Sequence, residues 1–224
     1  MYTGLGILAI ILIVFVTWHF ASRRQSLPCP VWLRWMVELD NPFTRTNRSA
    51  VIIEHLDLEP GMFVLDMGCG PGRLTIPAAL EVGEQGRVVA VDIQAGMLRR
   101  AEQKAVAAGL DNVEFIQADA GRGLLEKSCF DRALLIAVLG EIPDREIVLG
   151  EIFEALKPGG ILSITEIIFD PHFQRQSTVR RLARQTGFVE KAIFGNSIAY
   201  TMHLEKPAGT ATAVDGRQGS CKTI

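Results

Sequence analysis

The sequence has few cysteines, few aromatic residues and almost no net charge. Its four cysteines are scattered, with no CxxC pair and no regular spacing, so the sequence predicts neither a metal site nor a disulfide framework. We therefore expect reduced thiols in a domain that faces the cytosol. A formal net charge of −2, without a strip of basic and aromatic residues, argues against a nucleic-acid partner.

Charged residues are also missing from the first 22 positions. A helix over the apolar run from Gly4 to Phe20 would be roughly 26 Å long, nearly the thickness of the hydrocarbon core. Trp18 stands where an interfacial anchor belongs, and Arg23 and Arg24 follow directly. A signal peptide would carry its basic residues before the apolar run and a small-residue cleavage site after it. We predict that residues 1–24 form a transmembrane anchor, with the N-terminus outside and the catalytic domain cytosolic.

The remaining chain divides into a linker, a domain and a tail. Residues 25–44 read as an amphipathic juxtamembrane linker, in which Trp32 and Trp35 stand at helical spacing beside charged residues. This linker either rests on the bilayer surface or covers the domain, and both interpretations stay open. Residues 45–206 form the predicted domain, whereas 207–224 have no apolar period and read as a disordered tail.

Short apolar, β-branched runs alternate with helical stretches through the predicted domain. The expected strands cover residues 62–67, 87–92, 113–117, 131–138, 161–166, 189–193 and 198–204. One expected helix begins near residue 74, and the others cover 95–108, 144–156 and 177–185. The stretch "KPGG" at 157–160 reads as a turn that ends the helix before it. Buried strands that alternate with helices predict an α/β fold, a doubly wound, mostly parallel sheet.

The stretch "VLDMGCGPGRL" follows the first expected strand with the pattern D-x-G-x-G-x-G, whose glycines are Gly68, Gly70 and Gly72. A dinucleotide fingerprint would place its third small residue at position 73, which is Arg73 here. Asp66 before the glycines would repel a phosphate group. The loop therefore favours a ligand with a cationic end over a nucleotide phosphate.

This run resembles motif I of the class I S-adenosylmethionine-dependent methyltransferases. Further matches follow in the family's order: "VVAVD" ending at Asp92, "NVEFIQADA" with Asp119, "FDRALLIAVLGEIPDRE" and "ALKPGGILSITE". The resemblance covers about residues 45–206 and is strongest to the small-molecule branch with the quinone-biosynthesis enzymes. It implies a Rossmann-like, seven-stranded sheet with an antiparallel last strand, and S-adenosyl-L-methionine as the cofactor.

The resemblance also implies the cofactor-binding residues. The three glycines let the backbone approach the methionine portion, and Asp66 faces its amino group or sulfonium. Asp92 takes the ribose hydroxyls and Asp119 the adenine amino group, although both residues also read as turn or strand-end caps. The other implied cofactor contacts are Cys69, Ile93, Met97, Ala120 and Ala137.

Methyl transfer from a sulfonium depends mainly on alignment, and it needs a base only when the acceptor atom carries a proton. The candidates at the carboxyl edge of the sheet are Glu141, Asp144, Glu166 and His172. We predict His172 as the base, because histidine titrates near neutral pH. The alternative is a loop histidine without a catalytic role. Glu141 is the second predicted catalytic residue, and its alternative role is to shape the loop beside the sulfonium. Relatives often carry histidine where this chain has Gly140, and we expect His203, within the last strand, to be structural.

The predicted function is a membrane-anchored methyltransferase that acts on a lipid, a quinone or another hydrophobic small molecule by in-line transfer. The anchor supports such an acceptor, because tethering raises the effective concentration of membrane-dissolved molecules. One alternative is a non-catalytic scaffold that binds the cofactor. A nicotinamide-dependent oxidoreductase is the other, and Arg73 and Asp66 argue against it. The sequence does not predict an oligomeric state.

Overall fold

The computed structural model describes residues 47–210 together with residues 6, 38, 40 and 44. Strands and helices alternate along the chain, as the apolar pattern predicts. The elements are α3 (Ser49–Leu56), β1 (Phe63–Met67), α4 (Thr75–Val82), β2 (Arg87–Asp92), α5 (Ala95–Ala107), β3 (Val113–Gln117), β4 (Phe130–Ile136), α6 (Arg145–Ala155), β5 (Leu156–Ile167), α7 (Gln176–Gln185), β6 (Val189–Gly195), β7 (Ala199–Glu205) and the 3₁₀ helix η3 (Ala208–Thr210).

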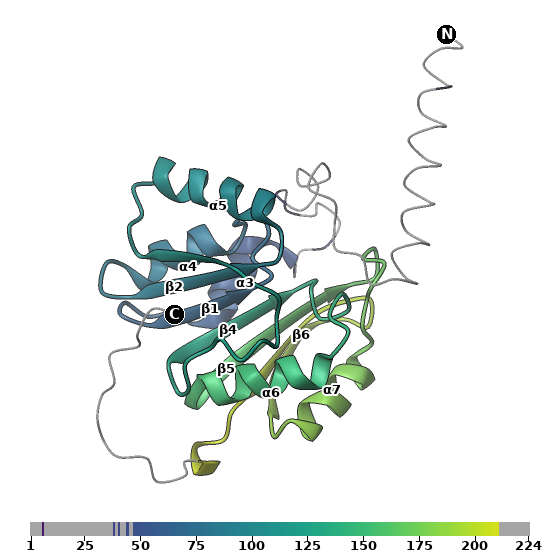
Figure 1. The fold of residues 1–224 in the computed structure, drawn as a ribbon. Helices are drawn as coiled ribbons and strands as arrows, with labels where there is room; N and C mark the ends of the chain where they lie inside the picture. The colour runs from purple at the N-terminus through teal and green to yellow at the C-terminus, as the bar shows by residue number, and fades with distance from the viewer. Residues whose placement is uncertain (1–5, 7–37, 39, 41–43, 45–46, 211–224) are drawn as a thin grey trace.

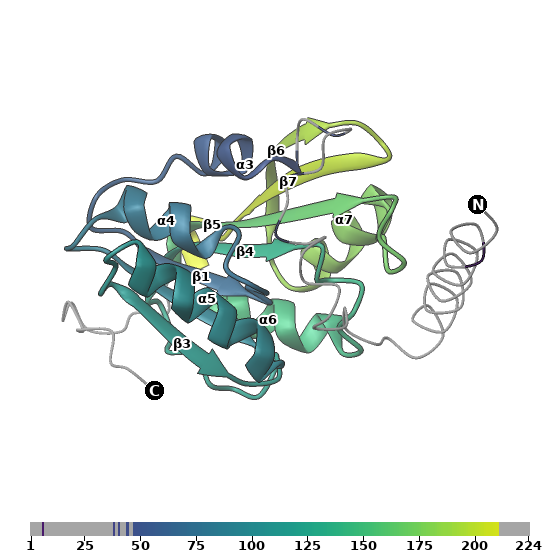
Figure 2. The same ribbon diagram turned by 90° about the horizontal axis from the view of Figure 1, so that it is seen from above.

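The seven strands form one sheet in the order β3-β2-β1-β4-β5-β7-β6, with β3 at one edge and β6 at the other (Figure 2). Strand β7 runs antiparallel to both of its neighbours, whereas the pairs from β3 to β5 are parallel. This confirms the predicted sheet with an antiparallel last strand. The strand order reverses between β1 and β4, and ligands of open α/β sheets bind at the carboxyl ends of the strands at such a point.

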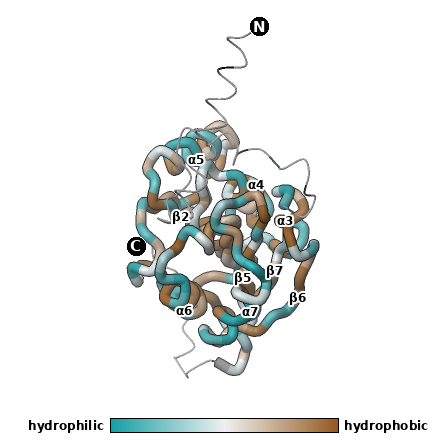
Figure 3. Tube along the Cα trace, turned by 90° about the vertical axis from the view of Figure 1, so that its right-hand side faces the viewer, coloured by the Kyte–Doolittle hydropathy of each residue, from teal (hydrophilic) through white to brown (hydrophobic). Residues whose placement is uncertain are grey.

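Helices α3, α4 and α5 cover one face of the sheet and α6 and α7 cover the other (Figure 1). Successive strand residues point to opposite faces, so Val64 packs in the cluster with α3 and α4 while Leu65 packs in the cluster with α6 and α7. Leu134 and Leu135 of β4 divide in the same way. The tube in Figure 3 accordingly shows hydrophobic strand segments in the interior, between the helices. Both faces of the sheet are buried, so the site is left to the strand ends.

One predicted turn is wrong. Residues 157–160 belong to β5 instead of ending the preceding helix, because Gly159 N–H donates to Lys206 O and Lys206 N–H to Gly160 O. The pairing of β4 with β5 jumps from Phe130↔Leu156 to Arg132↔Ile161, so a bulge absorbs the extra residues. Gly159 has φ +81° within this bulge. Pairing with residues far away in the sequence therefore overrides the local turn preference.

The predicted anchor and linker lie outside the described residues, apart from positions 6, 38, 40 and 44. Within the part of the chain that the structure describes, no helix is both long and apolar enough to span a bilayer. Helix η3 falls in the segment predicted as a tail, and residues 211–224 lie outside the description. Cys129 is disulfide-bonded, so the expectation of reduced cysteines is wrong at that position.

Candidate active site

The loop after β1 uses its three glycines for different purposes. Gly68, Gly70 and Gly72 have φ angles of +75°, +53° and +77°, in the left-handed region that favours glycine. A Cβ on Gly68 would lie 2.5 Å from a methyl carbon of Val138, and one on Gly72 would lie 2.9 Å from Cβ of Ala101. A Cβ on Gly70 would meet nothing within 4 Å. Two of the glycines therefore permit close packing, and Gly70 presents bare backbone to open space.

Asp92 connects this loop to the end of β2. Its Oδ2 accepts a hydrogen bond from Gly70 N at 2.9 Å, and its Oδ1 accepts one from Gln94 N at 2.8 Å. The carboxylate is buried; burial raises its pKa, and the two N–H donors act in the opposite direction. These bonds match the cap alternative, but each oxygen keeps a further acceptor site. The binding of ribose hydroxyls by Asp92 remains a prediction.

Asp66 turns toward the first residue of α4. Its Oδ2 accepts a hydrogen bond from Thr75 Oγ1 at 2.6 Å. Burial raises the pKa of Asp66 to about 6, with a smaller contribution from the charge of Asp92. The sequence interpretation missed Thr75, although a hydroxyl residue soon after a glycine loop is a visible pattern. The described contact of Asp66 is thus structural, and its role toward a ligand remains a prediction.

The region predicted to hold the adenine lies where β2 and β3 end. Ile93 is half exposed, whereas Met97 is buried in α5. Asp119 is exposed, and its Oδ2 lies 3.5 Å from Arg122 Nη2. Asp119 and Ala120 also line a small, mostly apolar hollow with Met67, Val91, Ile116, Ala118, Gly121, Leu124, Leu125 and Glu151. The lining combines apolar walls with the carboxylate of Asp119, and the binding of adenine there remains a prediction.

Two other predicted cofactor contacts differ in character. Cys69 is buried and burial raises the pKa of its thiol well above the ordinary value, so it is a packing residue and not a nucleophile. Ala137 has φ +56° at the carboxyl end of β4, and its N–H donates to Thr165 O at 2.8 Å. A non-glycine residue in this conformation stores strain, of a kind that concentrates at functional sites.

Arg73, the residue that departs from the dinucleotide fingerprint, is bound to residues that precede α3. Its Nη1 donates to Asp40 Oδ1 at 3.0 Å and to Asn47 O at 2.8 Å. The guanidinium therefore ties the glycine loop to the chain that precedes α3.

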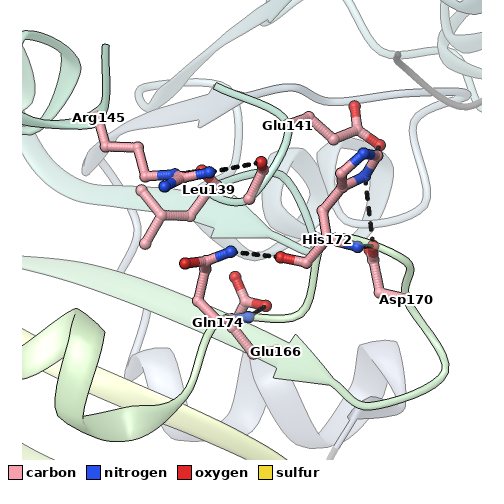
Figure 4. A network of polar contacts seen from close by, with 8 residues as sticks. Leu139, Glu141, Arg145, Glu166, Asp170, His172 and Gln174 are labelled. Carbon is pink, nitrogen blue, oxygen red and sulfur yellow. Dashed lines mark hydrogen bonds and ion pairs between the residues drawn. The ribbon is translucent and has the colours of Figure 1, made fainter. Parts of the chain in front are cut away.

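The structure brings the two predicted catalytic residues together. His172 Nδ1 lies 3.8 Å from Glu141 Oε1 and 3.6 Å from Asp170 Oδ1, with the ring between the two carboxylates (Figure 4). Asp170 was missed, although the D-x-H spacing is a signal for it: its Oδ1 accepts His172 N–H at 2.7 Å, as in an Asx turn. A histidine flanked by carboxylates can accept a proton, because they stabilise the imidazolium that forms.

Gly140 makes room for this histidine. A Cβ at position 140 would overlap the carbonyl oxygen of His172 and lie 2.6 Å from its Cβ. Arg145, from the start of α6, donates to Leu139 O and Gly140 O, both at 2.9 Å, and fixes the loop on which His172 rests. The backbone of His172 can therefore take this position only because residue 140 has no side chain.

The other candidates occupy different surroundings. Glu166 is buried at the end of β5 and accepts a hydrogen bond from Gln174 N at 2.8 Å. Asp144 is exposed just before α6 and makes no capping side-chain bond there. His203 is buried in β7 with its ring edge-on to Phe194; burial lowers its pKa to about 4, so it is neutral at pH 7 within the sheet.

Comparison with known proteins gives one family. The family model described as a methyltransferase domain matches residues 58–206. The demethylmenaquinone methyltransferase of Bacillus cereus strain B4264 is 38% identical over 105 residues, which are 47% of this chain and 44% of the relative. The match therefore spans less than half the length of that relative.

Solved structures share the fold at low sequence identity. A SAM-dependent methyltransferase from Aquifex aeolicus superposes with a TM-score of 0.70 at 21% identity, covering 79% of this chain and 98% of that one. The [4+2]-cyclase SpnF superposes with a TM-score of 0.63 at 18% identity, covering 72% and 80%. The second likeness shows that this fold alone does not fix an activity.

Proposed function

This chain belongs to the methyltransferase domain family, and we propose that it transfers the methyl group of S-adenosylmethionine to a hydrophobic small molecule, a quinone or a lipid. The observation that carries the proposal is that two sets of residues lie at the same carboxyl edge of the sheet. One is the glycine loop joined to Asp92, and the other is His172 between two carboxylates. The first suits a nucleoside with a cationic chain, and the second suits an acceptor that must lose a proton.

The residues fit the cofactor. Gly70 presents a backbone that no side chain covers, Asp92 keeps acceptor capacity for a vicinal diol, and the hollow with Asp119 has apolar walls. Bound S-adenosylmethionine supplies an electrophilic methyl group on a sulfonium with a neutral leaving group. The chain's part is to align the two reactants and to exclude water from between them.

His172 takes the proton that the acceptor loses at Nε2, because Nδ1 is buried and lies between the carboxylates of Glu141 and Asp170. The carboxylates of Glu141 and Asp170 orient the ring and stabilise its charged form. Asp170 acts from the same loop, and Glu141 acts from the loop after β4. No metal is required for this step, because the sulfonium is already activated.

Two observations and one prediction support a hydrophobic acceptor. The relative from Bacillus cereus is named for a quinone. The predicted anchor would hold the domain against a bilayer. On the acceptor side, the exposed apolar residues Ile168, Phe169 and Ile198 stand together, with Ile168 N–H donating to Ile198 O at 2.8 Å. An apolar rim of this kind lowers the cost of passing an apolar molecule from lipid to the strand ends.

We place the domain on the cytosolic side, because Arg23 and Arg24 follow the predicted anchor. The disulfide at Cys129 speaks for the opposite side, since disulfides persist in oxidising compartments. A membrane-impermeant maleimide applied to intact cells, after mild reduction, separates the two. Labelling only after the cells are opened supports the cytosolic side, and labelling of intact cells overturns it.

The activity is tested with the full-length protein in detergent micelles, methyl-labelled S-adenosylmethionine and two acceptor sources. One source is a total membrane-lipid extract, and the other is a reduced, short-chain demethylmenaquinone. Label in a solvent-extractable product, absent from an Asp92→Ala control, supports the proposal. Tight cofactor binding with no transfer to either source contradicts it and leaves the scaffold alternative.

A further inference from the structure

The loop between β5 and α7 is held to the sheet at Gln174. Glu166 Oε2 accepts a hydrogen bond from Gln174 N at 2.8 Å, and Tyr200 Oη donates one to Gln174 O at 2.7 Å. Glu166 and Tyr200 are register partners on β5 and β7, and both are buried. Two neighbouring side chains of the sheet therefore bind both backbone groups of one loop residue.

Gln174 passes this restraint to His172. Its Nε2 donates to His172 O at 2.6 Å (Figure 4), and that carbonyl oxygen fills the space left by Gly140. The N–H of His172 is bound in turn by Asp170. Both backbone groups of His172 are thus fixed, and the ring is aimed between Glu141 and Asp170 as a consequence.

We propose that Glu166 and Tyr200 act as a clamp on Gln174 that positions His172, so that Glu166 is a positioning residue of the transfer reaction. The inference rests on the proposed function, in which His172 is the base. It differs from the sequence interpretation, in which Glu166 was one of several candidate bases. In the clamp Glu166 touches neither acceptor nor cofactor, and it acts through Gln174.

The electrostatics make the clamp sensitive to pH. Burial raises the pKa of Glu166 to about 8; Asp170 and Glu141 add to this, while the Gln174 N–H and Arg145 oppose it. Glu166 is therefore a neutral acid at pH 7. Its Oε1 has no hydrogen-bond partner among the described residues, so ionisation would leave a buried charge beside two carboxylates.

Residues from four elements face Glu166. Asp170 comes from the loop after β5, Glu141 from the loop after β4, Arg145 from α6 and Tyr200 from β7. Arg145 donates to Leu139 O and Gly140 O and its charge opposes the effect of the two carboxylates on Glu166. Ionisation strengthens the bond from Gln174 N–H but places a charge beside Asp170 and Glu141. We expect this repulsion to displace the loop that carries Asp170 and His172 as the pH rises through about 8, and transfer to fall with it.

Three variants separate the clamp from general stability. Glu166→Leu and Tyr200→Phe each remove one bond to Gln174, and each should lower kcat about tenfold, roughly the worth of one buried hydrogen bond. The Kd for S-adenosylmethionine should stay within about threefold, because Gln174 is remote from the glycine loop. Glu166→Gln keeps an acceptor oxygen for Gln174 N–H, so it should retain wild-type kcat at pH 7 but lose the fall above pH 8. Glu114→Gln, on β3, is the matched control and should change neither quantity.

A spectroscopic readout keeps the test independent of activity. The chain has four histidines, so ¹⁵N-histidine labelling of the full-length protein in micelles gives few ring signals, and His172→Ala identifies the one of interest. We expect the His172 ring shifts to change in Glu166→Leu and in Tyr200→Phe, and to show in wild type a step near pH 8 that Glu166→Gln abolishes.

Unchanged His172 shifts in Tyr200→Phe, with no step near pH 8 in wild type, would overturn the clamp, even if Glu166→Leu fails to fold. A wild-type protein that shows the step but transfers no methyl group would instead overturn the proposed function. The two failures are therefore distinguishable in one set of samples.

Discussion

The glycine loop after β1 and the His172 cluster after β4 and β5 lie at the same edge of one sheet, but they are built from different materials. The functional part of the loop is its backbone. Its three glycines have positive φ, two of them pack against neighbouring side chains, and Gly70 N–H donates a hydrogen bond to Asp92. The cluster consists of side chains, with carboxylates around a histidine and a glutamine that restrains it. The difference indicates a division of labour between binding one reactant and processing the other.

If that division holds, substitutions in the cluster should affect turnover and leave cofactor binding alone, while those in the loop should do the reverse. The following predictions test it, from the largest expected effect to the smallest.

His172→Ala should lower kcat by about 100-fold or more, the range for loss of a general base. The Kd for S-adenosylmethionine, measured by calorimetry, should change by less than about threefold, since the ring lies between Glu141 and Asp170. His55→Gln, a histidine of α3, serves as the control. An equal loss of binding and turnover in His172→Ala would break the proposed division.

Gly140→Ala should lower kcat/KM by about 100-fold, or roughly 2.7 kcal/mol, because the new methyl group overlaps the carbonyl of His172. Gly150→Ala is the matched control: it lies in α6 with nothing near its Cβ position, and alanine there should raise stability by up to about 1 kcal/mol. Transfer close to wild type in Gly140→Ala would mean that His172 need not occupy this place.

Asp92→Ala should weaken cofactor binding at least about tenfold, or roughly 1.4 kcal/mol. It removes the acceptor of Gly70 N–H as well as the expected partner of the ribose hydroxyls. Asp92→Asn keeps one acceptor oxygen, so its cofactor affinity should lie between those of wild type and Asp92→Ala. An unchanged dissociation constant in Asp92→Ala would contradict the assignment of the loop to the cofactor.

The succession of strands and helices and most of their boundaries were predictable, because they follow from local apolar patterns and a familiar succession of motifs. The partners of the site residues were not. Asp66 meets Thr75 within one β-turn-α unit, but His172 fits Gly140 only because two loops 32 positions apart meet at one sheet edge. The same reason explains residues 157–160, which read locally as a turn and pair instead with Lys206. Patterns along the chain carry no information on such contacts.

The pH dependence of stability extends the comparison to both regions, because each holds a buried acid. The pKa of Asp66 is raised from 3.8 to about 6 and that of Glu166 from 4.5 to about 8. Between these values the folded state holds more protons than the unfolded state. The contribution of the two groups to the free energy of unfolding is therefore fully present below about pH 4 and is lost as the pH rises to about 8.

Asp66→Asn should remove the part of this loss that lies between pH 4 and 6, and Glu166→Gln the part that extends to pH 8. Thermal unfolding from pH 3.5 to 9 measures both, and about 1 kcal/mol corresponds to a change of roughly 2–4 °C in Tm for a chain of this size. Parallel curves for wild type and Glu166→Gln would show that Glu166 is ionised in the folded protein at neutral pH.

Arg73→Ala should have the smallest effect. Its ion pair with Asp40 is partly exposed, and such pairs contribute at most about 1 kcal/mol, less at high salt. Cofactor affinity should stay within about twofold, because the guanidinium is bound to Asp40 and to the carbonyl oxygen of Asn47. A large loss of affinity would show that Arg73 reaches the ligand, and the loop would then need a different interpretation.

The most direct test of the central claim is the release of S-adenosylhomocysteine by the full-length protein, measured by mass spectrometry with and without reduced demethylmenaquinone or membrane-lipid extract. The account predicts release that depends on the added acceptor, that falls about 100-fold in His172→Ala, and that occurs at unchanged cofactor affinity. Cofactor binding without acceptor-dependent release, for either source, would contradict it.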